Sequence, residues 1–378
     1  MRISLENGIK MIGVIIYFYF IVYIYANCTH TTLDQYHQNH TDNKEVDNST
    51  DKSVNNTNQI ENDDSNNYDL WIKWKLLHNK TYTTHKEYYE HYENWQLNLL
   101  SIKEHNVKHK KGLELYATGL NQFSDLNWKH INEVYLTNLS KYSLKPKMKK
   151  TILLKYALNK SKDIPNSWDW RTMGVVSGVK LQGECGACWA FSAAGALEGQ
   201  LNNKTGHFIE LSSQQLIDCS QSFGNHGCLG GDMNNAFRYV ESNGIQKEEN
   251  YPYLNKEGKC QHTKSKSVIH SKMIIEVKAH DEEELKTVLY EHGPVSAGIN
   301  VEQQFIRYKT GIYQSSSCSA TNVNHAVLIV GYGHENGIDY WIIKNSWGTT
   351  WGEDGYVRIR RNYNNMCGVA TMASIPKL

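Results

Sequence analysis

The sequence lacks the features that mark several specialised classes of protein. Only five of its 378 residues are proline, and no segment after residue 26 is apolar for long enough to span a bilayer. The 40 basic and 39 acidic side chains nearly cancel, which argues against a dedicated nucleic-acid binder. We find no internal repeat. What remains is an ordinary globular composition and a length that suggests about two domains.

The one long apolar run lies at the N-terminus. Arg2 and Lys10 precede the run Met11–Tyr25, and the small residue Ala26 closes it. This pattern is typical of a secretory signal peptide over residues 1–26. The alternative is a signal anchor that stays in the membrane, but the run is shorter than the ~20 residues of a spanning helix. We therefore expect a soluble mature protein with no stable membrane insertion.

The near-zero net charge conceals segments of different composition. Residues 27–67 contain ten Asn and eight acidic residues against two Lys, and we expect an acidic, Asn-rich, disordered spacer there. Residues 68–140 are aromatic-rich and read as a helical domain. Residues 141–162 hold eight lysines and little else that would pack. We therefore expect residues 141–163 to form a basic linker that is accessible to cleavage. Residues 164–378 are again globular.

Apolar periodicity predicts the main helices and strands. In the first region we expect helices over residues 86–110 and 128–136. In the second we expect helices at Trp189–Leu201, Ser212–Ile217 and Met233–Asn243, then strands at Ser267–Val277, Val295–Ile299, Ala326–Tyr332, Asp339–Lys344 and Gly355–Ile359. A helical half followed by a strand-rich half predicts an α+β fold with two lobes around a cleft.

Cysteine parity indicates one free thiol. Seven cysteines follow Cys28, which falls at the signal cleavage region, so three bridges leave one over. Cys185-Gly-Ala-Cys188 has three interpretations: a zinc knuckle, a redox pair, or one bridged cysteine beside a nucleophile. Zinc lacks nearby partner ligands, and the redox pair lacks a preceding βαβ strand. The third is favoured because C-G-[SA]-C-[WY] is the local signature of papain and cathepsin nucleophiles.

The histidine and asparagine that accompany such a cysteine nucleophile are expected about 130–150 residues downstream of it. His325 lies 137 residues after Cys188, and Asn345 lies 157 after it. With these residues the chain resembles the papain-like cysteine peptidases, and most closely their cathepsin L-like branch, over about residues 68–378. Four separated motifs carry the resemblance: residues 182–192 (QGECGACWAFS), residues 227–231 (GCLGG), the segment around His325 (NHAV), and residues 345–352 (NSWGTTWG).

The resemblance implies a cysteine endopeptidase with a helical lobe and an antiparallel, barrel-like lobe. Cys188 is then the nucleophile, favoured as a thiolate by its place at a helix N-terminus and by His325 as imidazolium. Asn345 orients the histidine ring, Trp347 covers their bond, and Gln182 donates to the oxyanion. The implied disulfides are Cys185–Cys228, Cys219–Cys260 and Cys318–Cys367. No cofactor or metal is expected. The alternative is a catalytically silent homologue that acts as a binding or inhibitory protein.

The same resemblance suggests the substrate site. Gly230 and Gly231 would align an extended peptide, and Asp232 would draw a basic group. The pocket for the residue two before the cut (P2) is expected to be apolar, with Met372 favouring Leu or Val over Phe; the expected substrate-binding residues are Gly230, Gly231, Met233, Gly298, Val323, Asn324, Trp347 and Met372. Only 28 residues separate Gly231 from Cys260. This leaves no room for an exopeptidase occluding loop.

Two motifs upstream resemble those of cathepsin L-like propeptides. The helical pattern ERFNIN is matched by Glu87, Trp95, Asn98, Ile102 and Asn106, and the short motif after it by Gly119, Asn121, Phe123 and Asp125. They imply an inhibitory propeptide that runs through the cleft in reverse and is removed in acid. His91 stands where the family has Arg, which suggests a pH-sensitive propeptide.

The remaining expectations concern the cell and the partners. Candidate glycosylation sites are Asn79, Asn138, Asn159 and Asn203. We expect passage through the secretory pathway to a lysosome or vacuole, or to the outside of the cell. Expected partners are protein and peptide substrates, the chain's own propeptide and cystatin-type inhibitors. Nucleic acid is not expected, and the protein should be a monomer.

Overall fold

A computed structural model describes residues 54–142 and 164–378. The signal peptide, Cys28, most of the expected linker and Asn159 lie outside these residues. The chain divides into two units, Met1–Ser65 and Asn66–Leu378. In the first unit the structure describes only helical backbone from residue 54 onward. None of the described helices is both long and apolar enough to cross a bilayer.

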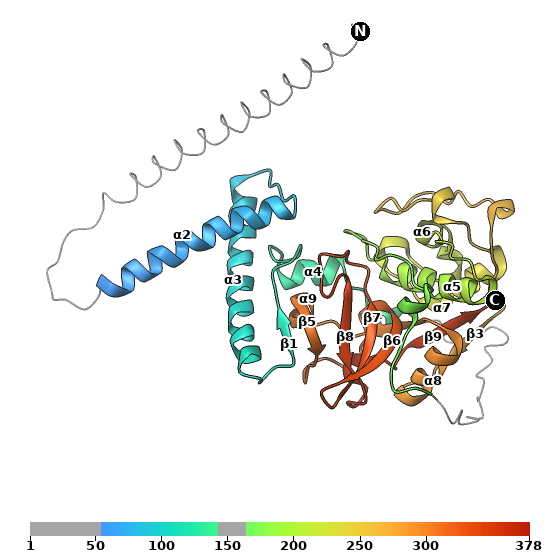
Figure 1. The fold of residues 1–378 in the computed structure, drawn as a ribbon. Helices are drawn as coiled ribbons and strands as arrows, with labels where there is room; N and C mark the ends of the chain where they lie inside the picture. The colour runs from blue at the N-terminus through green and yellow to red at the C-terminus, as the bar shows by residue number, and fades with distance from the viewer. Residues whose placement is uncertain (1–53, 143–163) are drawn as a thin grey trace, which may run out of the picture. The chain divides into compact units, whose positions relative to one another are not determined.

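Two helices open the described chain, α2 (Val54–Leu77) and α3 (His85–Lys110) (Figure 1). Their contact is aromatic, since Trp71 stacks on Trp74 at 5.2 Å and lies 5.5 Å from Trp95, between ring centroids. Thr84 caps α3 by accepting a hydrogen bond from the Glu87 amide. Residues 54–67, which the sequence assigns to the Asn-rich spacer, have helical backbone in the structure. Once a helix is anchored by its tryptophans, extending it costs little.

The helical lobe of the second region is built on one buried helix. This is α5 (Cys188–Thr205), against which α6 (Ser213–Cys219) and α7 (Met233–Asn243) pack. Six of the 18 residues of α5 are alanine or glycine, and its buried positions include Ala190, Ala193 and Gly195. Small side chains let strand β6 approach closely, and a Cβ added at Gly195 would meet Leu328 at 2.7 Å.

The strand-rich lobe is a nine-stranded sheet. Its path runs β1-β5-β8-β7-β6-β4-β9-β3, with β2 paired to β6, and only β5 and β8 run parallel. The strands are β1 (Tyr116–Thr118), β2 (Trp168–Asp169), β3 (Met273–Glu276), β4 (Val295–Ile299), β5 (Tyr308–Tyr313), β6 (His325–Glu335), β7 (Ile338–Lys344), β8 (Tyr356–Arg360) and β9 (Ala373–Lys377). Three further helices are α4 (Trp128–Val134), α8 (Glu282–His292) and α9 (Gln303–Ile306). Single 3₁₀ turns include η1 (Leu139–Lys141) and η4 (Gly227–Leu229).

Strand β1 comes from the N-terminal region, which is the name used here for residues 68–142, yet it belongs to this sheet. Tyr116 pairs with Gly311 and Ala117 with Thr310, both in β5. Because a strand edge has unpaired backbone groups, this pairing satisfies them and fixes the N-terminal region to the second lobe. Sequence patterning did not predict β1, β2, β5, β9, α8 or α9.

Candidate active site

The free thiol lies at the first turn of the buried helix. Cys188 begins α5 and is fully buried. Among the described cysteines it alone forms no disulfide, and the bonded pairs are Cys185–Cys228, Cys219–Cys260 and Cys318–Cys367. These are the pairs that the family resemblance implies. The backbone amide of Ala326 is directed at the Cys188 sulfur, so the start of α5 meets the start of β6.

Adjacent strands bring the histidine and the asparagine together. His325 begins β6, and Asn345 follows the last residue of β7, which pairs with β6. The distance from His325 Nε2 to Asn345 Oδ1 is 2.8 Å, and both side chains are buried. Trp347 lies against the His325 ring at 4.6 Å between centroids. The bond is therefore shielded from water.

Burial decides the protonation state of this pair in the precursor. It raises the pKa of Cys188 to about 11 and lowers the pKa of His325 to about 4. Desolvation disfavours charge on either group. The neutral thiol and neutral imidazole are thus the stable forms while the site is covered. This differs from the ion pair expected for the mature enzyme, because the N-terminal region excludes water here.

Gln182 is held in place from both ends of its amide. Its Oε1 accepts a hydrogen bond from Ser346 Oγ at 2.8 Å, and its Nε2 donates to Cys185 O at 3.0 Å. The same Nε2 donates to the carbonyl of Tyr135 at 3.3 Å. The Tyr135 carbonyl therefore accepts a hydrogen bond from the Nε2 group that we expect to donate to the oxyanion during catalysis. Ser346 was not singled out from the sequence.

The segment Tyr135–Tyr142 lies between the two lobes. On one side the Thr137 amide donates to Asn324 O at 2.7 Å, and the Leu139 amide donates to Val323 O at 3.3 Å. On the other side the hydroxyls of Thr137 and Tyr142 donate to Leu229 O at 3.1 and 2.9 Å. The segment thus fills the place where a peptide substrate is expected.

Leu139 occupies the pocket expected for P2. It is fully buried in one apolar cluster with Met233 and Val323. A Cβ added at Gly298 would lie 3.1 Å from a Leu139 methyl group. Met372 packs against the same cluster.

Asp232 has a structural role that the sequence analysis did not predict. It is buried and caps α7 by accepting a hydrogen bond from the Asn235 amide. Burial raises its pKa to about 6. One carboxylate oxygen is therefore used within the lobe, and the attraction of a basic substrate group stays a prediction for the uncovered site.

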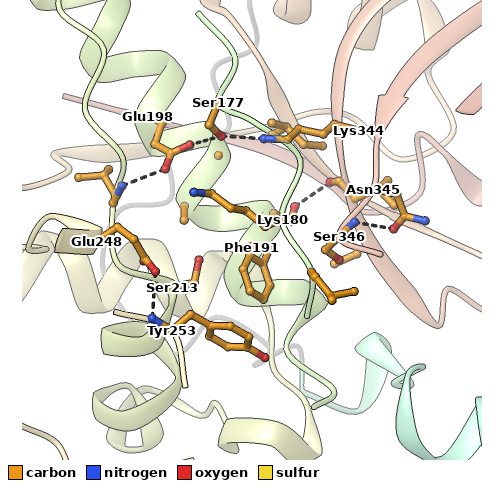
Figure 2. A pocket seen from close by; sticks show the side chains of 18 residues that line it. Ser177, Lys180, Phe191, Glu198, Ser213, Glu248, Tyr253, Lys344, Asn345 and Ser346 are labelled. Carbon is orange, nitrogen blue, oxygen red and sulfur yellow. Dashed lines mark hydrogen bonds between the residues drawn. The ribbon is translucent and has the colours of Figure 1, made fainter. Parts of the chain in front are cut away.

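A cavity of about 100 Å³ with a mixed lining of apolar and charged side chains lies behind the site (Figure 2). Figure 2 shows Lys344 donating to Ser177, which donates in turn to Glu198, at 2.6 and 2.7 Å. Burial lowers the pKa of Lys344 to about 8 and raises that of Glu198. This chain of hydrogen bonds joins α5 to the end of β7, next to Asn345. A glutamate inside a helix gave no sequence signal for such a role.

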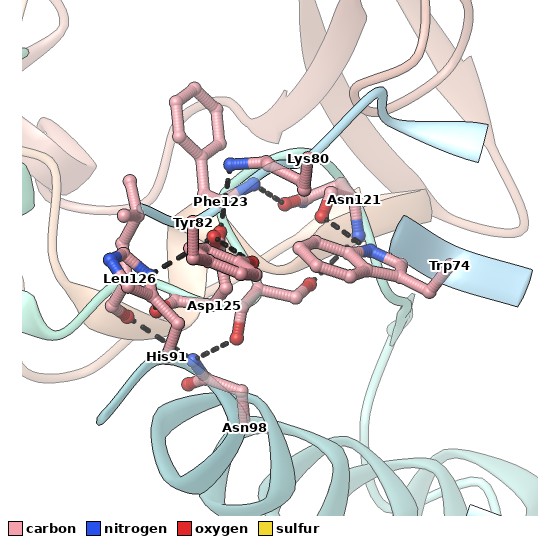
Figure 3. Close-up of polar contacts among 10 residues, drawn as sticks. Trp74, Lys80, Tyr82, His91, Asn98, Asn121, Phe123, Asp125 and Leu126 are labelled. Carbon is pink, nitrogen blue, oxygen red and sulfur yellow. Dashed lines mark hydrogen bonds and ion pairs between the residues drawn. The ribbon is translucent and has the colours of Figure 1, made fainter. Parts of the chain in front are cut away.

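The N-terminal region is anchored around one buried carboxylate, Asp125 (Figure 3). Its oxygens accept from Lys80 Nζ and the Tyr82 hydroxyl, both at 2.9 Å, and lie 3.1 Å from His91 Nδ1. These contacts hold the pKa of Asp125 below its usual range against the cost of its burial. The pKa of His91 is raised, chiefly by its hydrogen bond to Asp125. The histidine therefore takes the place of the family's arginine as a partner of this carboxylate.

Four of the other motif residues bind the N-terminal region to the strand-rich lobe, namely Asn98, Gly119, Asn121 and Phe123. The Asn121 amide donates to Ile306 O at 2.7 Å, and Phe123 packs edge-on against Trp347 at 5.3 Å. Arg307 donates to Asn98 Oδ1 and, at 3.1 Å, to Ser101 Oγ. Of the remaining motif residues, Trp95 and Ile102 are buried, Asn106 bonds to Thr118, and Gly119 donates to Arg307 O. The Phe123 contact reaches the tryptophan that covers His325.

A buried thiol at a helix start, an Asn-oriented histidine on the facing strand and a covering segment define the precursor of a papain-like thiol peptidase. The description "Papain family cysteine protease" matches residues 164–377, and "Cathepsin propeptide inhibitor domain (I29)" matches residues 71–129. The chain belongs to the papain family of cysteine proteases. It is synthesised with an inhibitory propeptide, and the name propeptide is used here for residues 68–142.

Relatives and solved structures agree with this assignment. The chain is 44% identical over 314 residues to a cathepsin L-like proteinase of Fasciola hepatica, covering 82% of this chain and 93% of the relative. It is 40% identical to cathepsin S of Bos taurus, with coverage of 82% and 92%. A digestive procathepsin L3 of Tenebrio molitor superposes with a TM-score of 0.74 at 39% identity, covering 82% of this chain and 99% of that one. No group of three candidate metal ligands occurs among the described residues.

Proposed function

We propose that the mature chain is an endopeptidase that cleaves peptide bonds through a Cys188 thiolate and a His325 imidazolium. The observation that carries the proposal is the His325–Asn345 hydrogen bond beside the thiol at the start of α5. Removing the propeptide readmits water, which lowers the cost of charge on both groups. The α5 N-terminus and the Ala326 amide then favour the thiolate.

The reaction follows from these positions. The thiolate attacks the scissile carbonyl, and the oxyanion that forms accepts hydrogen bonds from Gln182 Nε2 and the Cys188 amide. His325 gives its proton to the leaving amine, which leaves a thioester on Cys188. Water deprotonated by His325 then hydrolyses the thioester and regenerates the thiol. Asn345 keeps the imidazole ring oriented throughout.

We infer a P2 preference for Leu from the propeptide itself. Leu139 fills the pocket next to Gly298 and Val323, and Met372 packs against the same cluster. The chain runs from Gly231 to the Cys219–Cys260 disulfide without an occluding insertion, which supports endopeptidase activity. The three disulfides fit an oxidising compartment, and we propose delivery to a lysosome or vacuole, or secretion.

One experiment tests this function against the silent-homologue alternative. The secreted precursor is incubated at acid pH and assayed with fluorogenic peptides that end in Leu-Arg, Val-Arg and Phe-Arg. We expect hydrolysis in the order Leu, Val, Phe, and labelling of Cys188 by an epoxide inhibitor. Neither cleavage nor labelling would mean that the chain is catalytically silent. Faster cleavage of Phe-Arg would contradict the pocket assignment alone.

A second prediction concerns the oxyanion donor. Replacing Gln182 by Ala should lower kcat by about 10²–10³-fold with little change in KM, since the hydrogen bond forms fully only in the transition state. The matched control is Gln182→Glu, which keeps the acceptor for Ser346 and loses the donor. Both variants should label with the epoxide at a rate well above that of a Cys188→Ala sample. An unchanged kcat in both would remove Gln182 from the mechanism.

A further inference from the structure

Asn138 occupies an unusual place in the segment that covers the active site. It begins the sequence Asn138-Leu139-Ser140, which is an acceptor pattern for N-glycosylation. Thr137 and Leu139 on either side are buried, whereas Asn138 is exposed. Its backbone is extended, with φ −68° and ψ 93°, so its side chain leaves the chain on the side opposite to its neighbours.

A sugar on the Asn138 side chain would not break a helix cap. It makes no capping hydrogen bond to η1, although it stands at the N-cap position. Its neighbours hold the backbone instead, through the amides of Thr137 and Leu139. Asn203, the acceptor candidate in the peptidase region, differs because its Nδ2 donates to His292 O at 3.2 Å. Asn138 is thus a fixed and outward-facing acceptor in the segment that covers the reaction centre.

We propose that Asn138 carries an N-linked glycan that shields the covered site from attack by other peptidase molecules. In the transfer step, Asn138 Nδ2 forms a bond to C1 of an oligosaccharide held on a lipid diphosphate. The C1–oxygen bond breaks, the lipid diphosphate leaves, and the transferase takes up the amide proton. The transfer takes place before folding, and the exposure of Asn138 allows the folded precursor to keep the sugar.

The need for a shield follows from the proposed function, on which this inference rests. Leu139 is the residue that the P2 pocket accepts, so the segment around it is itself a potential substrate once it leaves the cleft. Peptidases bind substrates as extended chains, and a bulky sugar beside Leu139 blocks such binding. The first cut by another molecule is then directed to the linker beyond residue 142. The glycan departs with the propeptide and leaves the mature cleft bare.

Occupancy is tested by mass spectrometry. The full precursor with Cys188→Ala, which cannot process itself, is secreted from a eukaryotic host. Removal of glycans by an amidase in ¹⁸O water converts each occupied Asn to labelled Asp. We expect the label on Asn138 in the parent precursor and in Ser140→Thr, which keeps the acceptor pattern. Ser140→Ala and Asn138→Gln should lose it. An unlabelled Asn138 in the parent precursor would overturn the proposal.

Protection is tested on the same four precursors and on a fifth, Asn203→Gln. Each is incubated with the acid-activated wild-type enzyme and, separately, with subtilisin, and cuts within residues 135–142 are mapped over time. We expect Ser140→Ala and Asn138→Gln to be cut there about fivefold faster or more than the parent and Ser140→Thr. Asn203→Gln, which removes an acceptor elsewhere, should match the parent. Equal rates in all variants would show that the glycan is not a shield.

The two enzymes separate this inference from the proposed function. If the activated sample cleaves no peptide, the proposed function fails, and the subtilisin time course still measures protection by the glycan. If the activated sample is a peptidase and both enzymes cut all variants alike, only the glycan shield fails. Folding of each variant is checked by its secreted yield and by an intact disulfide map.

Discussion

Cys188 should react with iodoacetamide about a thousandfold faster or more once the propeptide has been removed. In the precursor burial raises the thiol pKa to about 11, so only about one molecule in ten thousand carries a thiolate at pH 7. In the mature enzyme we expect the thiolate to pair with the His325 imidazolium and to be the main form. The lower intrinsic nucleophilicity of a low-pKa thiolate reduces part of this gain.

The pH profile distinguishes this electrostatic effect from simple steric protection. For the precursor we expect the alkylation rate to rise about tenfold per pH unit up to pH 9, as for any weakly ionised thiol. For the mature enzyme it should be nearly flat from about pH 5 to 8. Mature His325→Ala should regain the steep profile of an ordinary cysteine. A flat, slow profile in the precursor would show that access alone limits the reaction, and equal rates in both forms would contradict the burial argument.

Replacing Asp125 by Ala should release the propeptide's hold on the active site. Asp125 is buried and is the shared partner of Lys80, Tyr82 and His91. Its partners Lys80, Tyr82 and His91 are half-buried, so loss of the carboxylate leaves them partly desolvated without their acceptor and costs about 1–3 kcal/mol. Opening of the propeptide should become about 10–10²-fold more frequent. It is measured in the full precursor with Cys188→Ala as the rate at which subtilisin cuts residues 135–142 at pH 7.

Glu90→Ala is the matched control for this variant. Glu90 is also an acidic residue of the propeptide, yet its side chain is exposed and forms an ion pair with Lys86, which is exposed as well, at 3.7 Å. Exposed pairs of this kind contribute about 0–1 kcal/mol, so the rate of cutting by subtilisin should stay close to that of the parent. If Asp125→Ala behaved like Glu90→Ala, the carboxylate would not be the anchor of the propeptide.

His91 makes the stabilising contribution of the Asp125 cluster depend on pH, and the sign of this dependence follows from the two pKa shifts. Because the pKa of His91 is raised in the folded protein, its contribution is present below pH ~6.5 and is lost as the pH rises through the folded pKa. Because the pKa of Asp125 is lowered, its contribution is lost only as the pH falls below its usual value of ~3.8. The His91–Asp125 pair therefore stabilises the folded propeptide between about pH 4 and 6. Acid activation must then act through other groups. The His91→Arg precursor should open less than the parent at pH 8 and equally at pH 5.

Local sequence patterns carry enough information to place a helix or strand whose bounds depend on its own residues. The helix expected at Met233–Asn243 and the strand expected at Val295–Ile299 end at those residues in the structure. Helix α8 was missed although Asp281 caps it and three glutamates follow, which is a readable start signal. Strand β5 gave no such signal, since its neighbours β1 and β8 are about 190 and 50 residues away along the chain.

The sequence by itself determined which chemical groups are available. Motif spacing singled out Cys188, His325, Asn345 and Gln182, and parity required one free thiol, because these depend on residue type and order alone. Only the tertiary structure decided their state. The shifted pKa values of Cys188 and His325, the Tyr135 carbonyl on Gln182 and the Leu139 side chain in the P2 pocket arise from segments distant in the chain. Exclusion of water depends on what packs over a group, and packing is set by the whole fold.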